Sequence, residues 1–590
     1  MPAPPLRGRC CFYRLCSVCG LPLCLASDLG YTLPCMPEES VAWESLLEAL
    51  RPRVAAACPG ATVVLFFSVC DGTRRASIVQ ARAATFDEAW AEGRMRCLGL
   101  AAGLGGAQRW LRVDCVCAVQ ATTWAALRER LAQTKRNYFR LGIALDAALE
   151  CAFLEGELNA HAMLYPRGEV PHAVVNEGNF LLHAKTRYGI ESIDFQDAVP
   201  VWLFATLGWF ADAQGAHDLE GGETAAAGRR LLPRFDAEAA RALVESGAGY
   251  LACQVDARGR FAYGTFPCFD RAIAHYNALR HASTVYAMVD AWPQARSEAL
   301  RQAAERALDY LRANLVRVYQ EGGQPPRAFV VDEGGEIKLG ANAVALLALA
   351  RHAEVFGGRQ HAELMEQLGR GILSMQDCAT GRFVHVLQAA DLSVKAAHRT
   401  IYYDGEAAFA LMRLHAATGD ARWLAAVERA FEHFIAAEHW RAHDHWLAYC
   451  VNELTLHRPL ERYFAFGVRN VADYLDFVLL RETTFPTLLE LMMATQSLLV
   501  RLRRMPFGAA VLQGLDLGRF ERALRHRAQY LANGFFWPEW AMFFRAPHRI
   551  VGSFFIRHHG FRVRIDDVEH YLSGLAAYLR DGVADLGAEP

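Results

Sequence analysis

The chain has 590 residues, more than one ordinary domain contains, so we expect two or three domains. Hydrophobic residues make up 53% of the chain and charged residues 21%, which excludes a protein that is disordered throughout. The formal net charge of −2 excludes a general electrostatic attraction to nucleic acid or to an anionic membrane surface. A charged ligand would therefore have to be recognised by a local group of side chains.

Residues 1–40 are predicted to form a leader outside the folded domains. Three arginines precede a weakly apolar stretch there, and six of the sixteen cysteines lie before residue 36. Three interpretations remain open. The segment could be a disordered or misassigned leader with Met36 as the true start, a signal peptide over residues 1–27, or half of a zinc site at Cys16 and Cys19.

The later cysteines stand in apolar settings without paired spacing, so we expect free thiols. This pattern favours a cytoplasmic protein, with export as the alternative if the leader is a signal peptide. No run of about 20 apolar residues is present, so no membrane-spanning helix is predicted. The sequence gives no indication of the oligomeric state.

Residues 41–160 mix β-rich and helical runs and are predicted to form an α+β domain. The expected elements are helices over 41–56, 85–104 and 122–134 and strands over 61–70, 76–83 and 110–119, with a turn at Asp71-Gly72-Thr73. Residues 161–232 are predicted to connect this domain to the next, with short strands at 173–175 and 199–205. The run from Glu220 to Arg230 is predicted to be a flexible, exposed linker.

From Phe235 onward the hydrophobic pattern has the 3.6-residue period of helices. The predicted helices lie at about 236–252, 280–292, 296–318, 340–355, 360–374, 405–417, 420–436, 444–455, 460–479, 485–502, 516–532 and 567–580. Runs rich in small residues alternate with more charged runs, as inner and outer helices of a closed ring would. We therefore predict a mainly α fold, an (α/α)6 toroid of six helical hairpins over 233–582 preceded by the smaller α+β domain.

Two further patterns support hairpin repetition. The segment from Gln254 to Phe261 and the segment from Gln376 to Phe383 both end in Gly-Arg-Phe, and both follow a predicted outer helix. In addition, short polar clusters open every second helical run. They are Arg280-His281, Lys338 with Asn342, Tyr402-Tyr403-Asp404 with Glu406, Asp444-His445, Thr483-Thr484 and Asp566-Asp567 with His570. Functional side chains are therefore expected at one end of the ring.

These segments resemble the six-hairpin toroids of carbohydrate-active enzymes, in particular the C-terminal domains of glucuronyl C5-epimerase-like proteins and related sugar epimerases and glycosidases. The residues that carry the resemblance are Lys338 to Leu349, Tyr402 to Leu414 and Arg564 to His570. The resemblance covers about residues 235–582. It implies an epimerase, hydrolase or lyase acting on an anionic or uronate-containing saccharide in the funnel of the toroid.

The cluster at the start of the predicted helix 405–417 is the first candidate for catalysis. Its tyrosines and carboxylates could share proton transfer at a sugar carbon or a glycosidic oxygen, or the carboxylates could simply cap the helix. A hydrolase needs two carboxylates at a defined separation, and the last helix offers the second. The candidate catalytic residues are Tyr402, Tyr403, Asp404, Glu406, Asp566 and Asp567.

Other polar residues at the helix starts are candidates for substrate binding. Arginine can bind an anion through its guanidinium group or pair with a carboxylate of the same domain, and tryptophan can stack on a sugar or fill the core. The candidates are Tyr276, Asn277, Arg280, His281, Lys338, Asn342, Asp444, His445, Trp446, Arg557, His558, Arg562, Arg564 and His570.

The sequence contains no Walker A loop, dinucleotide fingerprint or Gly-x-Ser-x-Gly elbow in a suitable context, and the spacing of His558, Asp566 and His570 matches no established zinc pattern. We therefore expect neither cofactor nor metal. The expected partner is a saccharide or anionic polymer, with no nucleic acid. A non-catalytic scaffold or binding protein, or an accessory factor of cell-envelope polymer synthesis, is the alternative function.

Overall fold

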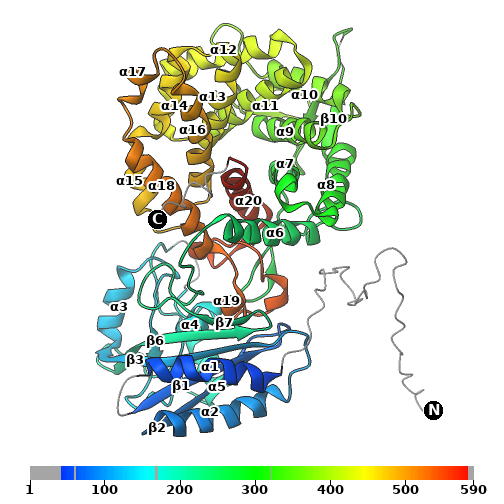
Figure 1. Cartoon of the computed structure of the whole chain (residues 1–590). Helices are drawn as coiled ribbons and strands as arrows, with labels where there is room; N and C mark the ends of the chain where they lie inside the picture. The colour runs from blue at the N-terminus through cyan, green and yellow to red at the C-terminus, as the bar shows by residue number, and fades with distance from the viewer. Residues whose placement is uncertain (1–41, 59–61, 166–169, 321, 582–590) are drawn as a thin grey trace, which may run out of the picture.

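The structure is a computed structural model that describes residues 42–58, 62–165, 170–320 and 322–581. The expectations for the leader, including the start at Met36, the signal peptide and the Cys16–Cys19 half site, lie outside these residues. The described chain contains a sheet domain and a ring of helices, which pack against each other (Figure 1).

The sheet domain is built on an antiparallel sheet that has seven strands within the described residues, in the order β2-β1-β3-β6-β4-β5 with β7 also paired to β6. The strands are β1 (Val63–Cys70), β2 (Ser77–Ala83), β3 (Trp110–Thr123), β4 (Gly142–Ala144), β5 (Ala152–Phe153), β6 (Pro200–Asp212) and β7 (Gly215–Asp218). The helices are α1 (Trp43–Ala57), α2 (Phe86–Ala101), α3 (Trp124–Ala132), α4 (Glu155–Ala160) and α5 (Glu177–Tyr188).

Strand β1 is covered on both faces, which explains why its sequence is almost entirely apolar. Leu65 and Phe67 pack with α1 and α2 on one face, whereas Val64 and Phe66 belong to the core that continues into the helical ring. Successive side chains of a strand point to opposite faces, so a strand covered on both faces has no solvent-facing positions. All eight residues of β1 are buried accordingly.

The sheet corrects three expectations for the connecting region. Strand β6 pairs with β3 along its length and is a central strand, so the sheet domain crosses the predicted boundary at residue 160. Residues 173–175 are not a strand. The predicted flexible linker is wrong too, because Arg229 and Arg230 within it are buried.

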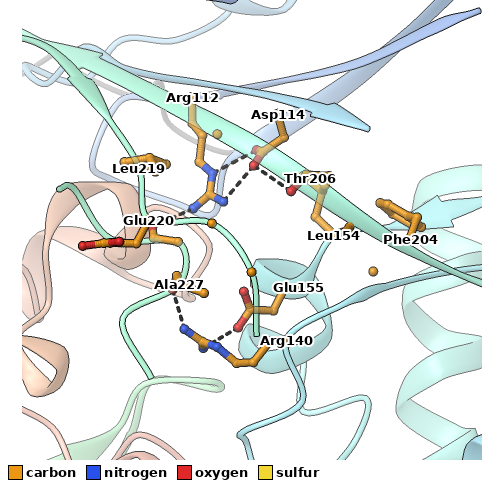
Figure 2. A pocket seen from close by; sticks show the side chains of 16 residues that line it. Arg112, Asp114, Arg140, Leu154, Glu155, Phe204, Thr206, Leu219, Glu220 and Ala227 are labelled. Atoms are coloured by element: carbon orange, nitrogen blue, oxygen red, sulfur yellow. Dashed lines mark hydrogen bonds and ion pairs between the residues drawn. The ribbon is translucent and has the colours of Figure 1, made fainter. Parts of the chain in front are cut away.

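Buried ion pairs hold this former linker segment in place (Figure 2). Arg112 binds Asp114 through two hydrogen bonds of 2.9 and 2.8 Å and also donates to the carbonyl oxygens of Gly228 and Glu539. Arg140 binds Glu155 and donates to backbone carbonyls between Thr224 and Ala227. The pocket beside these pairs has a volume of about 30 Å³, room for about two water molecules at most.

The ring confirms the predicted toroid. Among the described residues, six inner helices pack each on the next, and the last returns to the first. They are α7 (Ala278–Ala295), α9 (Leu339–Phe356), α11 (Tyr402–Thr418), α13 (His445–His457), α16 (Thr487–Leu502) and α20 (Ile565–Arg580). The outer helices are α6 (Ala237–Cys253), α8 (Glu298–Tyr310), α10 (Ala362–Ser374), α12 (Ala421–Ala436), α14 (Glu461–Ala472) and α18 (Leu517–Tyr530).

Inner and outer helices differ because inner helices are surrounded. In α9 every residue from Leu339 to Ala350 is buried, whereas α10 buries mainly one stripe that includes Met365, Leu368 and Ile372. By length and composition α9 could cross a membrane, but it is mostly buried within the ring, as core helices of this kind are. At Gly419 and Asp420 the chain turns from α11 into α12 through a left-handed glycine and an aspartate N-cap, as expected.

Small sheets and short helices fill the connections. The sheets are β8 (Gly264–Phe266), β9 (Arg271–Ala272) and β15 (Val563–Arg564), then β10 (Val316–Tyr319) and β11 (Arg327–Val330), then β12 (Glu336–Lys338), β13 (Val386–Gln388) and β14 (Val394–Ala396). The short helices are α15 (Leu475–Leu480), α17 (Gly508–Leu512) and α19 (Pro538–Ala541). Because β12 leads directly into α9 and β15 into α20, sheets lie at the end of the ring where inner helices begin.

The two Gly-Arg-Phe repeats adopt the same structure. In each, an isolated bridge closes the loop, joining Val255 to Phe261 and Gln376 to Phe383. Both glycines have positive φ, 86° at Gly259 and 73° at Gly381. Each glycine rests on the backbone of the next outer helix, where a Cβ atom would lie 2.0 or 2.1 Å from a carbonyl oxygen. The loop is thus a repeated contact between neighbouring hairpins.

Candidate functional site

A cluster of ionisable side chains lies where the inner helices begin. Its members are Glu406 of α11, Asp444 and His445 of α13, Glu490 of α16, and Glu569 and His570 of α20. The starts of neighbouring inner helices contact one another, as Gly340 does Glu406, Gly405 does Asp444 and Glu490 does His570. Their N-termini, with unpaired amides and the positive ends of the helix dipoles, therefore share this end. The positive potential of these helix ends stabilises the ionised form of nearby carboxyl groups.

Glu406 is the most unusual member. It is buried, and its Oε2 atom has no hydrogen-bond partner among the described residues. Burial and the nearby carboxylates of Asp444 and Glu569 raise the pKa of Glu406 well above its usual range. The raised pKa favours the protonated form of this carboxyl group. No side chain caps α11, so the alternative interpretation of Glu406 as a helix cap is wrong.

His570 is held by two glutamates. Its Nδ1 atom lies 2.8 Å from Oε1 of Glu490, and its Nε2 atom lies 3.7 Å from Oε1 of Glu569. The other Glu490 oxygen accepts a 3.0 Å hydrogen bond from the hydroxyl of Tyr449. Burial would lower the pKa of His570, but the charge of Glu490 and its hydrogen bond to the imidazole outweigh burial and raise that pKa to about 10. The imidazole is therefore protonated at neutral pH.

Glu569 is the second glutamate that faces His570, and its pKa is strongly raised. Burial raises the pKa of Glu569 to about 8, against the opposing charge of His570. Its Oε2 atom, like that of Glu406, has no partner within the part of the chain that the structure describes. The cluster thus holds two incompletely bonded carboxyl groups of raised pKa beside one imidazolium.

His445 faces His570 from the neighbouring part of the ring. The two ring centroids lie 5.5 Å apart. Asp444 caps α13 by accepting from the amides of Trp446 and Leu447, and its Oδ1 atom lies 3.4 Å from Nδ1 of His445. The Nε2 atom of His445 is buried and has no partner among the described side chains and backbone. One imidazole is thus charged and paired, and the other keeps a free nitrogen.

Two groups of residues in the described chain have the composition and spacing of metal ligands. His445, Glu490 and His570 each offer one atom, all within 4.8 Å of one another, and His385, His398 and Asp404 do the same. In the first group, the short contact between His570 and Glu490 is that of a hydrogen-bonded ion pair. The prediction of no metal stays a prediction.

The arginines predicted to bind substrate are paired with the aspartates predicted to be catalytic. Arg280 lies 2.7 Å from Asp566, which also binds Arg564, and Arg562 makes two 2.7 Å hydrogen bonds to Asp567. These are ion pairs within the domain, the alternative already considered for arginine. Asp566 and Asp567 therefore lie next to the cluster as anchors of the β15 segment, with Asp566 close enough to act on the charges of Glu569 and His570.

The remaining predicted catalytic residues surround Glu406. Tyr403 is buried against Gly340 at the start of α9, in the field of the Glu406 carboxyl group. Tyr402 is 42% exposed, with its ring 5.9 Å from that of His445, and so lies at the mouth of the cluster. Asp404 points elsewhere, to a 3.3 Å contact with His385.

Several predicted binding residues have structural contacts instead. Tyr276 is hydrogen-bonded to His281, whose other ring nitrogen bonds to the carbonyl oxygen of Ala307 on the outer helix, and Asn277 is the N-cap of α7. Asn342 joins Val330 to Lys338, whose ammonium group pairs with Asp332. Arg557 and His558 lie at the contact with the sheet domain, where Arg557 donates to Asn137 and lies over the Trp540 ring. These residues are not brought into the cluster.

Trp446 lies deeper in the ring, in contact with the aromatic rings of Tyr286, Phe409 and Tyr449. Sequence reasoning missed Glu490, Glu569 and Tyr449. Glu569 directly precedes the predicted His570 and lies one turn from Asp566, a signal that was available. Glu490 follows the Thr483-Thr484 cluster within an apolar run, where a single acid in a buried helix was the only indication.

No family model matches the chain, and no curated protein matches its sequence. Among solved structures the chain is similar to a D-mannose isomerase, with 11% identity, a TM-score of 0.42 and coverage of 58% of this chain and 97% of that one. It is similar to cellobiose 2-epimerase from Bacillus thermoamylovorans B4167, with 10% identity, a TM-score of 0.45 and coverage of 58% and 99%. It is also similar to the GH76A α-1,6-mannanase of Salegentibacter sp. HEL1_6, with 12% identity, a TM-score of 0.30 and coverage of 58% and 98%.

Proposed function

We propose that this chain is a carbohydrate-active enzyme of the epimerase or isomerase type, which moves a proton on a sugar carbon at the start of the inner helices. One observation carries the proposal. Two imidazoles from different inner helices face each other beside carboxyl groups of raised pKa, with one ring nitrogen of each within 4.8 Å of the other. Enzymes that move a proton need such a pair of groups within reach of adjacent atoms of one substrate.

The two imidazoles suit different roles. The free Nε2 atom of His445 can accept a proton from the carbon next to the carbonyl of an open-chain sugar. As that bond breaks, negative charge develops on the carbonyl oxygen, and the imidazolium of His570 stabilises it. Delivery of a proton by His570 to the opposite face of the same carbon gives the epimer, and it leaves His445 protonated and His570 neutral until both exchange protons with solvent. Transfer of the His445 proton to the neighbouring carbon, with loss of the hydroxyl proton of the enediol, gives the isomer.

Glu406 fits the same reaction as a hydrogen-bond donor. A protonated carboxyl group can donate to a substrate oxygen, which a carboxylate cannot do. Tyr402 offers an aromatic ring, and His445 beside it offers a hydrogen-bonding nitrogen. This combination suits a sugar, which has an apolar face and a rim of hydroxyl groups. The finer expectation of a uronate loses its main support, since Arg280, Arg562 and Arg564 are paired with aspartates.

Glycoside hydrolysis is the second candidate, because Glu406 and Glu569 have the raised pKa of a general acid. Hydrolysis also needs an ionised carboxylate that faces the substrate, and the oxygens of Asp444 already accept backbone amides. A non-catalytic scaffold would be the better interpretation if every acid of the cluster had a hydrogen-bond or ion-pair partner. The partnerless oxygens of Glu406 and Glu569, within the described residues, count against it.

The test is hydrogen exchange at a sugar carbon. The purified protein is incubated in deuterated water with mannose, glucose, N-acetylglucosamine, cellobiose and galacturonate, and deuterium at C1 and C2 is followed by NMR. We expect exchange with at least one reducing sugar, abolished in His445→Asn and His570→Asn but kept in His526→Asn on outer helix α18. Release of sugar from a glycoside without any exchange would replace the proposal with hydrolysis.

A further inference from the structure

A second cavity lies on the axis of the ring at the opposite end, where the inner helices finish. It has a volume of about 270 Å³, and every one of the six inner helices contributes to its wall. The cavity opens to solvent, since the side chains of Arg580 and Glu354 in its wall are 42% and 49% exposed. Its volume lies just below the range of small-molecule sites, about 300–1,000 Å³.

Aromatic rings separate this cavity from the cluster of ionisable side chains at the starts of the inner helices, called the reaction cluster below. Tyr286, Phe409 and Tyr449 line the cavity, and the Phe409 and Tyr449 rings stack with centroids 5.6 Å apart. Tyr449 belongs to both sites. Its ring faces the cavity, and its hydroxyl group donates to Glu490, which holds His570. A ligand in the cavity could therefore act on the charged imidazole through a chain of three residues, Tyr449, Glu490 and His570.

The charged groups of the wall occur as pairs. Asp290 lies 2.9 Å from Arg351 and 3.4 Å from Arg580, and Arg413 binds both Glu354 and Glu453. The negative ends of the inner-helix dipoles meet here and help to hold these arginines. Since each arginine has a carboxylate, a charged ligand would have to displace a partner. A neutral ligand rich in hydroxyl groups could instead bond to donors and acceptors in place.

We propose that this cavity is a second binding site for a neutral saccharide unit, which stacks on Tyr449 and Phe409 and hydrogen-bonds to the paired charges of the wall. We further infer that its occupancy acts on the reaction cluster through Tyr449 and Glu490. The binding site stands without the proposed function, whereas the effect on turnover rests on it.

The binding test uses methyl glycosides of glucose, mannose and galactose, which cannot open to an aldehyde and so cannot react. Calorimetry measures their affinity for the full chain and for Ser497→Trp, which places an indole into the cavity. We expect the variant to bind at least about tenfold more weakly, a loss of about 1.4 kcal/mol. The matched control Gln302→Trp adds the same indole on the exposed face of α8 and should bind normally.

Several outcomes would overturn the cavity as a saccharide site. Methyl glycosides could fail to bind, could bind Ser497→Trp normally, or could bind only when His445 is present, which would assign them to the reaction cluster. Preferential binding of citrate or arginine would overturn the neutral class of ligand. Selective glycoside binding without any hydrogen exchange on a reducing sugar would keep the cavity and reject the proposed enzymatic function.

Coupling is tested with Tyr449→Phe, which keeps the aromatic ring and removes the hydroxyl bond to Glu490. If the cavity acts on the cluster, methyl glycosides change kcat of the full chain but not that of Tyr449→Phe, while their affinity for the cavity stays within about twofold. Tyr319→Phe is the control, because it removes a hydroxyl bond to a backbone carbonyl away from the ring axis. Equal effects of the glycosides on all three proteins would reject the coupling.

Discussion

Glu406 and His570 show how one environment produces opposite protonation behaviour. Both lie at helix starts within the same ring. Among the described residues Glu406 has no cation in hydrogen-bond contact, so burial and neighbouring acids raise its pKa, whereas His570 is hydrogen-bonded to Glu490 and stays charged at neutral pH. Two groups whose environments shift their pKa values in this way suit proton transfer near pH 7.

The Glu406→Gln variant should lose at least about 99% of the proposed activity, because an amide cannot supply the proton of the carboxyl group. Its free energy of unfolding should fall by no more than about 1 kcal/mol, the size of one hydrogen bond, because the amide has nearly the same shape and Oε2 has no described partner to lose. Phe383→Ala is the contrasting variant, since removing a buried phenylalanine costs about 3–5 kcal/mol. Urea unfolding and kcat check both. Unfolding of Glu406→Gln with normal turnover per folded molecule would make Glu406 structural.

The His570 ion pair should give a pH-dependent contribution to stability. The pKa of His570 rises from 6.5 in the unfolded chain to about 10 in the folded one. Its contribution is therefore fully present below pH 6.5 and is lost as pH rises through about 10. The stability difference between the wild type and His570→Asn, measured by urea unfolding, should shrink over that window. A difference that is constant or grows with pH would contradict the assignment of the charge.

At the scale of elements, the two Gly-Arg-Phe loops show that hairpins are joined by a repeated backbone contact. Gly259 lies against the carbonyl oxygen of Arg306 on α8, and Gly381 lies against that of Arg429 on α12. Both positions combine positive φ with a close approach of two backbones, and glycine meets both demands. Each loop therefore fixes how closely one hairpin approaches the outer helix of the next.

Gly259→Ala and Gly381→Ala should each destabilise the protein by at least about 1–2 kcal/mol, from left-handed strain alone, with the backbone clash in addition. The effects should be similar, because the two loops are repeats. Gly334→Ala serves as the control, since a Cβ atom there meets nothing within 4 Å. Thermal unfolding of the three variants is the measurement. A neutral Gly381→Ala beside a damaging Gly259→Ala would show that only one loop bears on its neighbour.

At the scale of the whole molecule, the sheet domain and the ring share buried charges as well as apolar core. Arg230 donates to both oxygens of Glu539 on α19, and the pair is buried. Arg75 of the sheet domain donates to the carbonyl oxygens of Cys268 and Phe543 in the helical part. The contact is therefore too extensive for two domains on a flexible tether.

Limited proteolysis should leave residues 219–230 intact, because this segment is tied down by Arg112, Arg140 and Glu539. Glu539→Gln should destabilise the protein by about 3–5 kcal/mol, since it leaves the Arg230 charge buried without its partner. Mass spectrometry of tryptic fragments and a single thermal transition check these statements. Rapid cleavage between Glu220 and Arg230 with release of a stable helical fragment would restore the linker interpretation.

The sequence by itself determined the ring. Helical periodicity, capping residues and the alternation of small-rich and charged runs act within a few residues, so all twelve helices of the ring could be located from the chain alone. It also indicated that chemistry belongs to the inner-helix starts, and it selected Glu406, Asp444, His445 and His570.

Only the tertiary structure decided how those side chains pair. Arg280 and Asp566 are 286 positions apart in the chain, and Glu490 and His570 are 80 apart. Arg280 can pair with Asp566 only when the ring closes and α20 returns to α7. Glu490 can hold His570 only when α16 packs on α20. The central strand β6 and the burial of residues 227–230 were likewise settled by long-range pairing. Local patterns specify helices, whereas charge pairing and burial are properties of the assembled fold.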